Sequence, residues 1–179
     1  MTQFIALLKG INVGGHHKIK MEELRKLLGK LGLEGVVTYI QSGNVVFNSS
    51  HSDKKRLEEL ISSQLENHYG FKVPVIVKNI SEWQAVIDQM PFSDQDEAKL
   101  LITFLQQNPD PALVEQLKQF ASPSEELIFH QQFIYLHCPN GYGRTKLSND
   151  LIEKKLKVTA TTRNFKSVKK ILNLAIEQK

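Results

Sequence analysis

The chain has one cysteine, Cys138, in 179 residues, which excludes an internal disulfide framework and favours a reducing compartment. No apolar run approaches the roughly twenty residues that a membrane-spanning helix requires. The first residues, Met1–Gln3, carry no basic cluster of the kind that opens a secretory leader. We therefore expect a cytoplasmic protein without a membrane partner.

The motifs of several enzyme classes are also missing. No Gly-x-Ser-x-Gly elbow frames a serine nucleophile, and no Walker or Gly-x-Gly-x-x-Gly pattern marks a nucleotide-binding loop. His16 and His17 are adjacent and lack nearby cysteine or acidic partners, so they do not predict a metal site. No pair of acidic residues has the placement of a general acid and base. The sequence thus names no catalytic residue, metal or cofactor, and it leaves open whether the protein is an enzyme.

What the chain does contain is a regular alternation of short β-rich runs and amphipathic helical stripes. In the first half the order is strand, helix, strand, strand, helix, strand, helix. Pro74 favours an edge position for the last of these strands, because proline cannot donate to a strand ladder. The expected elements cover residues 4–8, 21–31, 36–41, 45–48, 54–69, 73–77 and 81–90.

The same order recurs beyond a polar connector, although the two halves share no obvious sequence identity. The order β-α-β-β-α-β is the split βαβ, or ferredoxin-like, motif. We therefore predict an α+β protein of two ferredoxin-like subdomains (βαββαβ plus a helix) with antiparallel sheets, at residues 1–92 and 97–179. The expected elements of the second half cover residues 100–105, 111–120, 126–129, 133–138, 147–156, 158–161 and 165–176.

This topology predicts which loops are neighbours. In a split βαβ unit, the third strand lies antiparallel between the parallel first and second strands. The end of the first strand then lies beside the turn between strands two and three, which places Gly10–Gly15 next to Ser42–Asn44. Strands three and four end together at the opposite edge, which places Asn140–Arg144 beside Thr161–Asn164 in the second half. A pseudo-twofold relation between the halves would bring both clusters to one cleft.

Glycine-rich backbone, helix N-termini and arginine are well matched to phosphate or carboxylate. In the first cluster, backbone N–H groups and polar side chains would orient an anionic ligand, and in the second, basic side chains would neutralise it. The candidate ligand-binding residues are Asn12, Gly14, Gly15, Ser42, Gly43 and Asn44 in the first cluster, and Gly141, Gly143, Arg144, Lys146, Thr162, Arg163 and Asn164 in the second.

Each of these residues also has a purely structural explanation. Ser42 and Gly43 are typical of a tight hairpin turn. Thr162 or Asn164 is a natural N-cap for the last helix. Arg144 and Arg163 would then pair with nearby carboxylates. These explanations account for the turn and the cap, but less well for the position of both arginines.

The basic residues are concentrated near the C-terminus. Between Arg144 and Lys170 the chain has nine basic residues and two acidic ones, whereas its overall net charge is only +4. This segment is either an anion-facing surface or the solvated face of two amphipathic helices. RNA-recognition domains share the βαββαβ order but need stacking aromatics on the central strands, where the first half of this chain has one aromatic each, Phe4 and Phe47, without the expected motif.

Two runs of the first half resemble a known family. Leu7–Gly15, followed by Met21 and Leu24, and then Thr38–Phe47 are similar to the bacterial domain-of-unknown-function 1697 family. The resemblance implies a two-part α+β fold with ferredoxin-like subdomains, and it implies no activity.

The resemblance continues into the second half, where Lys146-Leu147 and Thr161–Asn164 also fit the family pattern. The departures are small: Lys9 stands where arginine is common, and Phe165 where tryptophan is common. Together these observations predict a protein that binds a small anionic, phosphate-bearing ligand at its glycine-rich loops. The alternative is a non-catalytic nucleic-acid or protein-interaction module that uses the basic C-terminal face.

Overall fold

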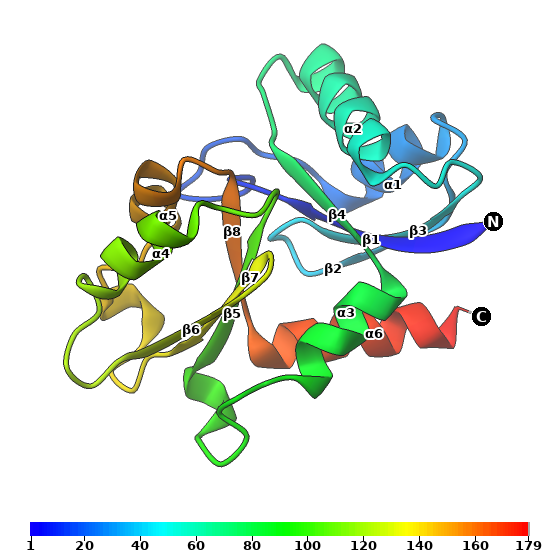
Figure 1. Cartoon of the computed structure of the whole chain (residues 1–179). Helices are drawn as coiled ribbons and strands as arrows, with labels where there is room; N and C mark the ends of the chain where they lie inside the picture. The colour runs from blue at the N-terminus through cyan, green and yellow to red at the C-terminus, as the bar shows by residue number, and fades with distance from the viewer. Residues whose placement is uncertain (179) are drawn as a thin grey trace. The chain divides into compact units, whose positions relative to one another are not determined.

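The fold contains two four-stranded antiparallel sheets with helices packed on them, as the sequence predicts (Figure 1). The computed structural model describes residues 1–178. In the first sheet the strand order is β2-β3-β1-β4, and β1 pairs antiparallel with both β3 and β4. Its strands are β1 (Thr2–Leu8), β2 (Glu34–Tyr39), β3 (Asn44–Ser49) and β4 (Val75–Asn79), with helices α1 (Met21–Gly29) and α2 (Lys54–Tyr69).

The second sheet repeats this arrangement with the order β6-β7-β5-β8, in which β5 pairs antiparallel with β7 and β8. Short 3₁₀ turns precede β5 and follow β7, and the second of these carries the predicted site residues. The elements are η1 (Glu97–Lys99), β5 (Leu100–Leu105), α4 (Pro111–Lys118), β6 (Glu126–His130), β7 (Phe133–His137), η2 (Tyr142–Arg144), α5 (Asn149–Leu156) and β8 (Ala160–Asn164).

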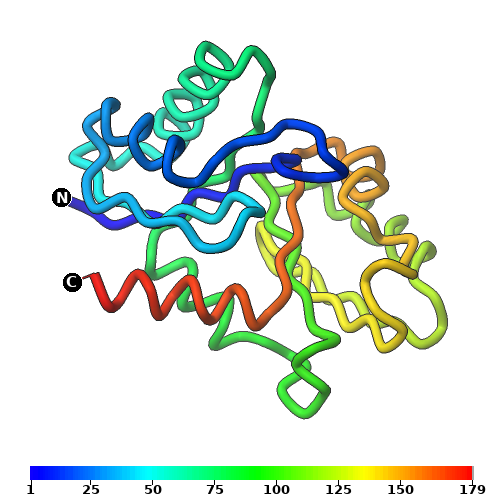
Figure 2. The backbone as a smooth tube through the Cα atoms, turned by 180° about the vertical axis from the view of Figure 1, so that it is seen from behind, coloured from blue at the N-terminus to red at the C-terminus, as the bar shows by residue number. Residues whose placement is uncertain are grey.

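Two further helices, α3 (Ile80–Asp88) and α6 (Phe165–Glu177), follow the last strand of each sheet. The chain divides into two compact units: the first unit is Met1–Ala85 together with the chain from Ile171, and the second unit is Val86–Lys170. The last turns of α6 therefore belong with the first sheet. There Gln3 Nε2 donates to the carbonyl of Ala175 at 2.9 Å, and the end of α6 lies beside the start of β1 (Figure 2).

The predicted order of elements is confirmed in both halves, and β4 lies at a sheet edge. Several predicted boundaries differ from the structure by two or three residues, and the one that bears on the site is the last strand, which spans Ala160–Asn164 instead of residues 158–161. Asn164 pairs with Leu101 of β5, and adjacent threonines favour the extended conformation, so the strand continues through Arg163. The stretch from Thr161 to Asn164 is therefore paired strand and not an irregular loop.

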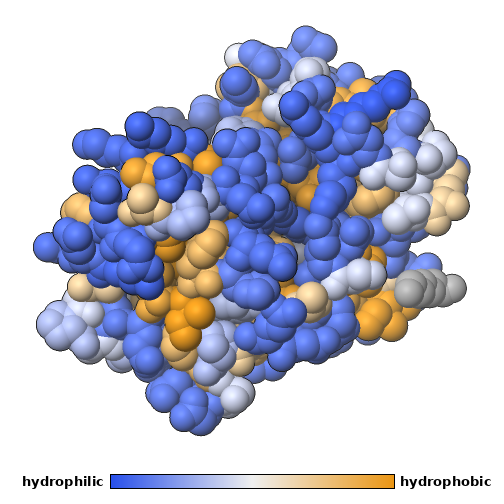
Figure 3. All heavy atoms as spheres, viewed as in Figure 1, coloured by the Kyte–Doolittle hydropathy of each residue, from blue (hydrophilic) through white to orange (hydrophobic). Residues whose placement is uncertain are grey.

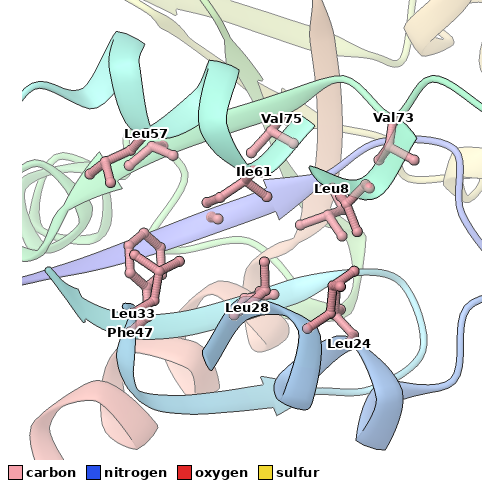
Figure 4. Packing of buried hydrophobic residues seen from close by; sticks show 14 of the residues in the cluster. Leu8, Leu24, Leu28, Leu33, Phe47, Leu57, Ile61, Val73 and Val75 are labelled. Atoms are coloured by element: carbon pink, nitrogen blue, oxygen red, sulfur yellow. The ribbon is translucent and has the colours of Figure 1, made fainter. Parts of the chain in front are cut away.

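The core of the first unit lies between one face of its sheet and the helices α1 and α2 (Figure 4). Alternate residues of Phe4–Leu8 face the helices, as the period of two along a strand requires. Leu24 and Leu28 of α1 and Leu57 and Ile61 of α2 supply the other side of this core. The apolar stripes read from the sequence are thus the surfaces that the helices bury.

The second unit has its own core on the corresponding face of its sheet. Leu101 and Leu105 of β5 pack with Leu117 of α4 and Ile152 of α5. Leu147, which precedes α5, is also fully buried in this cluster. Burial of Leu147 fixes the position of the chain that leads from η2 into α5.

Polar residues cover most of the face shown in Figure 3, and apolar residues appear there in small groups. No helix in the described part of the chain is both long enough and apolar enough to cross a membrane. The large hydrophobic residues that stay exposed among residues 1–178 are scattered; they are Met1, Val13, Ile40, Ile128 and Ile176.

Gly43 is the glycine that the first sheet most clearly requires. Its φ is +82°, and a Cβ atom placed there would lie 2.7 Å from Leu8 Cβ and 2.9 Å from Ile11 Cδ1. Its carbonyl accepts a hydrogen bond from the backbone N–H of Leu8 at 2.8 Å. The turn between β2 and β3 can therefore approach the end of β1 only with glycine at this position.

We predict that Gly43→Ala lowers the free energy of unfolding by about 2–4 kcal/mol, because it combines a left-handed φ with a backbone and side-chain clash. Urea denaturation followed by circular dichroism measures the change. Gly10→Ala is the matched control, since Gly10 has a φ of +72° but nothing within 4 Å of the added Cβ. It should cost only the conformational term of about 1–2 kcal/mol; equal losses in the two variants would contradict the close approach.

Candidate functional site

The loop between β1 and α1 folds into a miniature hairpin. Val13 and His16 form an isolated antiparallel bridge, with His16 N–H donating to the Val13 carbonyl at 2.9 Å. Gly14 and Gly15 form the tip, and both have positive φ values, +56° and +79°. These are the conformations of a two-residue hairpin turn, which glycine adopts without strain. The tip glycines are exposed, so their backbone is accessible to a ligand.

Asn12 holds this hairpin in place with its side-chain amide. Its Nδ2 donates to the carbonyls of Ile19 at 3.0 Å and Gln41 at 2.8 Å. Its Oδ1 accepts from the backbone N–H of Ile19 at 2.9 Å. The loop and the β2–β3 turn are therefore neighbours, as the topology predicts. Both N–H groups of the Asn12 amide are used within the protein, so this side chain acts as a latch between the two segments.

The β2–β3 turn is closed by similar internal contacts. Asn44 is buried, and its Nδ2 donates to the Tyr39 carbonyl and to Ser42 Oγ, each at 3.0 Å. Gly43 is buried against the end of β1. The polar groups of this turn thus stabilise its own conformation.

Basic side chains surround the hairpin. Lys18 and Lys20 are exposed, as are His16 and His17. The His17 ring stacks on Phe71 with 4.3 Å between ring centroids, and its Nδ1 donates to the Gly10 carbonyl at 3.1 Å. His17 is therefore part of the framework of the loop, whereas the two lysines are exposed.

In the second unit, the predicted cluster forms around Tyr142. This residue begins the η2 turn, and Gly141 precedes it with a φ of +90°. The Tyr142 hydroxyl hydrogen-bonds with the Thr162 side chain and with the Asn149 backbone. Burial raises the pKa of Tyr142, so the phenol stays protonated at neutral pH. The loop after β7 is thereby joined to β8 and to the start of α5.

Thr162 is the centre of this polar network. Its Oγ1 donates to Asn149 Oδ1 at 2.7 Å and lies 2.7 Å from Thr103 Oγ1. Because the single hydroxyl proton of Thr162 goes to Asn149, Thr103 is the donor in the second bond. A hydrogen-bond network in which every member has a partner is rigid, and this one holds the loop after β7 against β8 and the start of α5.

Arg163 occupies a different environment from Thr162. Successive residues of a strand point to opposite faces, so Arg163 lies on the other face of β8. It is 9% exposed, and its Nη1 donates to Thr161 Oγ1 at 2.7 Å and to the Thr162 carbonyl at 3.0 Å. Burial lowers the pKa of Arg163 to about 10, which leaves the guanidinium charged at neutral pH. Asn164 caps α6, because its Oδ1 accepts from the backbone N–H of Ser167 at 2.8 Å.

Arg144 and Lys146 are the predicted site cations that stay exposed. Within residues 1–178, neither side chain makes a hydrogen bond or an ion pair. They flank Thr145, whose Oγ1 accepts from the backbone N–H of Leu147 at 3.1 Å. Three residues after Thr145, Ser148 caps α5 by accepting from the backbone N–H of Leu151 at 3.3 Å. The pair therefore stands at the positive end of a helix, on a loop of fixed shape.

One unusual cation was missed by the sequence reasoning. Lys78 of β4 is 2% exposed, and burial lowers its pKa to about 8, partly opposed by Glu82 and Glu58. A lysine inside the apolar run Val75–Asn79 was the available signal. By contrast, Cys138 is a buried thiol whose pKa is raised to about 11, mainly by burial, so it stays protonated at neutral pH.

No group of three or more His, Cys, Asp or Glu side chains among residues 1–178 is placed to hold a metal ion. The structure brings together Asn12 with the β2–β3 turn, and Tyr142 with Thr162 and Asn149. By the alternation of side chains along β8, Arg163 leaves the strand on the opposite face from Thr162, although its guanidinium still interacts electrostatically with Tyr142.

Comparison with known proteins agrees with this architecture. The chain is similar to a solved structure described as conserved bacterial protein SP0830 from Streptococcus pneumoniae, with a TM-score of 0.79 and 29% sequence identity. The match covers 97% of this chain and 98% of that one. No curated protein shows significant similarity. The family model described as "Protein of unknown function (DUF1697)" matches residues 1–135, and the chain belongs to this family.

Proposed function

We propose that the protein binds a small anionic, phosphate-bearing ligand at the loop of residues 140–149 in the second unit. Arg144 and Lys146 neutralise the charge of the ligand, and the N-terminal turn of α5 contributes its partial positive charge. The observation that carries the proposal is the pairing of two exposed, unpartnered cations with a loop that is held rigid from behind.

The rigidity of this loop matters because ordering mobile side chains and loops on binding reduces the free energy of binding. The network of Tyr142, Thr162 and Asn149 removes most of that cost in advance for the backbone of this loop. A guanidinium can then form two parallel hydrogen bonds to a phosphate, and the ammonium adds a point charge beside it. Asp150 is the acidic residue of the first turn of α5, so Arg144, Lys146 and Asp150 together still carry net positive charge.

The other candidate residues take supporting roles in this proposal. Gly141, with its φ of +90°, permits the path of the η2 loop, and Thr162 holds it, whereas the backbone at Gly143 does not require glycine. In the first unit, Asn12 and Asn44 shape their loop through internal hydrogen bonds, and the exposed backbone of the hairpin tip is a secondary place for anion contact. Arg163 is assigned no direct contact, because its side chain is buried.

We predict that the double variant Arg144→Ala/Lys146→Ala weakens the binding of a phosphate-bearing compound by about 10- to 100-fold, since charge-assisted hydrogen bonds contribute about 1.5–3 kcal/mol. A thermal-shift screen with pyrophosphate, nucleotides and sugar phosphates identifies the compound, and calorimetric titration gives its dissociation constant. At a hundredfold excess over that constant, the wild-type chain should gain about 2.7 kcal/mol of stability.

The matched control is Lys154→Ala/Lys157→Ala, which removes the same charge from exposed positions at the other end of α5. It should bind within about twofold of the wild type. Equal weakening in both double variants would show a diffuse electrostatic effect and contradict the site. If the logarithm of the affinity instead falls linearly with the logarithm of the salt concentration, with a slope proportional to the number of phosphates neutralised, a nucleic-acid partner on the basic segment is favoured.

A second prediction concerns the support of the loop. Tyr142→Phe removes the hydroxyl that joins η2 to Thr162 and Asn149, so we expect about 1 kcal/mol less stability and weaker binding with Arg144 and Lys146 intact. Tyr135→Phe is the comparison, because its hydroxyl donates to the Val86 carbonyl at 3.0 Å elsewhere in the second unit. It should lose similar stability and keep full affinity. Unchanged binding by Tyr142→Phe would remove the rigid loop from the proposal.

A further inference from the structure

Strand β6 lies at one edge of the second sheet, beside β7 (Figure 1). In an antiparallel ladder, alternate residues of a strand bond to the strands on its two sides. The backbone N–H of Cys138 donates to the Lys99 carbonyl, so the even-numbered residues of β7 bond to β5 and the odd-numbered ones bond to β6. Leu127 and Phe129 of β6 stand opposite even-numbered residues of β7. Their N–H and C=O groups therefore point away from β7, toward the open side of the edge.

The other edge strands have their outward groups occupied or their ladder interrupted. In β4 the outward N–H of Val77 donates to Glu58 Oε1 at 2.8 Å. In β8 the outward N–H of Ala160 donates to Glu153 Oε1 at 2.8 Å. A β-bulge interrupts β2. Such devices prevent one sheet edge from pairing with another. β6 has no bulge, proline or lysine, and no side chain of residues 1–178 caps its outward groups.

The side chains of β6 are complementary to those of a second copy that runs antiparallel to it. Glu126, Ile128 and His130 are exposed and share one face of the strand, because side chains alternate along it. About a twofold axis at Ile128, the carboxylate of Glu126 stands opposite the imidazole of His130 of the second copy. Ile128, which is 42% exposed, then stands opposite its own counterpart and loses its contact with water. Opposite charges and apolar pairs in these positions stabilise a sheet.

The backbone selects the same axis. With the axis at Ile128, Leu127 and Phe129 of the second copy exchange both of their outward hydrogen bonds, and the whole strand is paired. An axis at Leu127 would set Glu126 opposite Ile128, and an axis at Phe129 would set His130 opposite Ile128. Either shift shortens the paired segment and removes the pairing of Glu126 with His130.

We infer that this chain forms a symmetric dimer in which β6 pairs with β6 of a second copy. The pairing joins the four-stranded sheets of two second units into one continuous sheet, and the same surface is used by both copies. A strand of five residues buries far less than the roughly 1,200–2,000 Å² of a stable interface, so the dimer is weak and depends on concentration. The residues of the proposed anion site lie outside β6, so this inference and the proposed function are tested separately.

Sedimentation velocity of the full chain, from micromolar to millimolar concentration, measures the association. Ile128→Lys sets two like charges against each other at the axis and should weaken dimerisation by about tenfold or more. Ile176→Lys is the matched control, because Ile176 is 51% exposed and lies on α6. It should associate like the wild type. A chain that stays monomeric throughout, or a dimer that Ile128→Lys leaves intact, would overturn the inference.

A second measurement tests the geometry and does not depend on the lysine variant. Residues opposite each other in a non-hydrogen-bonded pair have Cα atoms about 4.5 Å apart, within the range of a disulfide. Ile128→Cys should therefore cross-link into a disulfide dimer in oxidised glutathione much faster than the control Ile176→Cys, while the native Cys138 is buried. Equal rates of cross-linking in the two variants would contradict the pairing of β6.

Hydrogen exchange of the wild-type chain identifies the backbone groups that pair. The amides of Leu127 and Phe129 should exchange about tenfold more slowly when about nine in ten chains are dimeric. Exchange of these amides that does not change with concentration, although the chain dimerises, would place the interface elsewhere and overturn the inference.

Discussion

The central place of the first strand in each sheet is the constraint on which the remaining structure depends. Because β1 pairs antiparallel with β3 on one side and β4 on the other, its C-terminal end meets the β2–β3 turn, and β3 and β4 both end at the opposite end of the sheet. β5 does the same in the second unit. Each half therefore gathers distant loops at the two ends of a sheet before any side chain makes a specific contact.

Internal hydrogen bonding then decides which polar residues at these ends are available to a ligand. The Asn12 amide and the Asn44 amide are occupied by neighbouring carbonyls and a hydroxyl. Thr162 is occupied by Asn149 and Thr103. Leaving such groups buried without partners costs more than a hydrogen bond to a ligand returns, so residues of ligand-binding type are used first to stabilise the loops.

The sequence predicts the fold well because periodicity reports which face of each element is buried, and the two sheets follow from the order of elements. It predicts loop neighbours for the same reason, as the contact of Asn12 with Gln41 shows. Strand ends are less predictable: β8 extends to Asn164 only through its pairing with β5. The buried position of Lys78 was also not predicted, because a single strand does not reveal what covers it.

The two arginines of the predicted second cluster show why residue type alone does not identify a site. Arg163 is the more perturbed of the two, yet it is perturbed by burial among protein partners, and it stays charged. Arg144 is exposed and without a protein partner among the described residues, so an incoming anion would have no existing bond to displace. The free energy of binding is what remains after the cost of breaking existing hydrogen bonds and ordering mobile groups, and both costs are lowest for an exposed cation on a rigid loop.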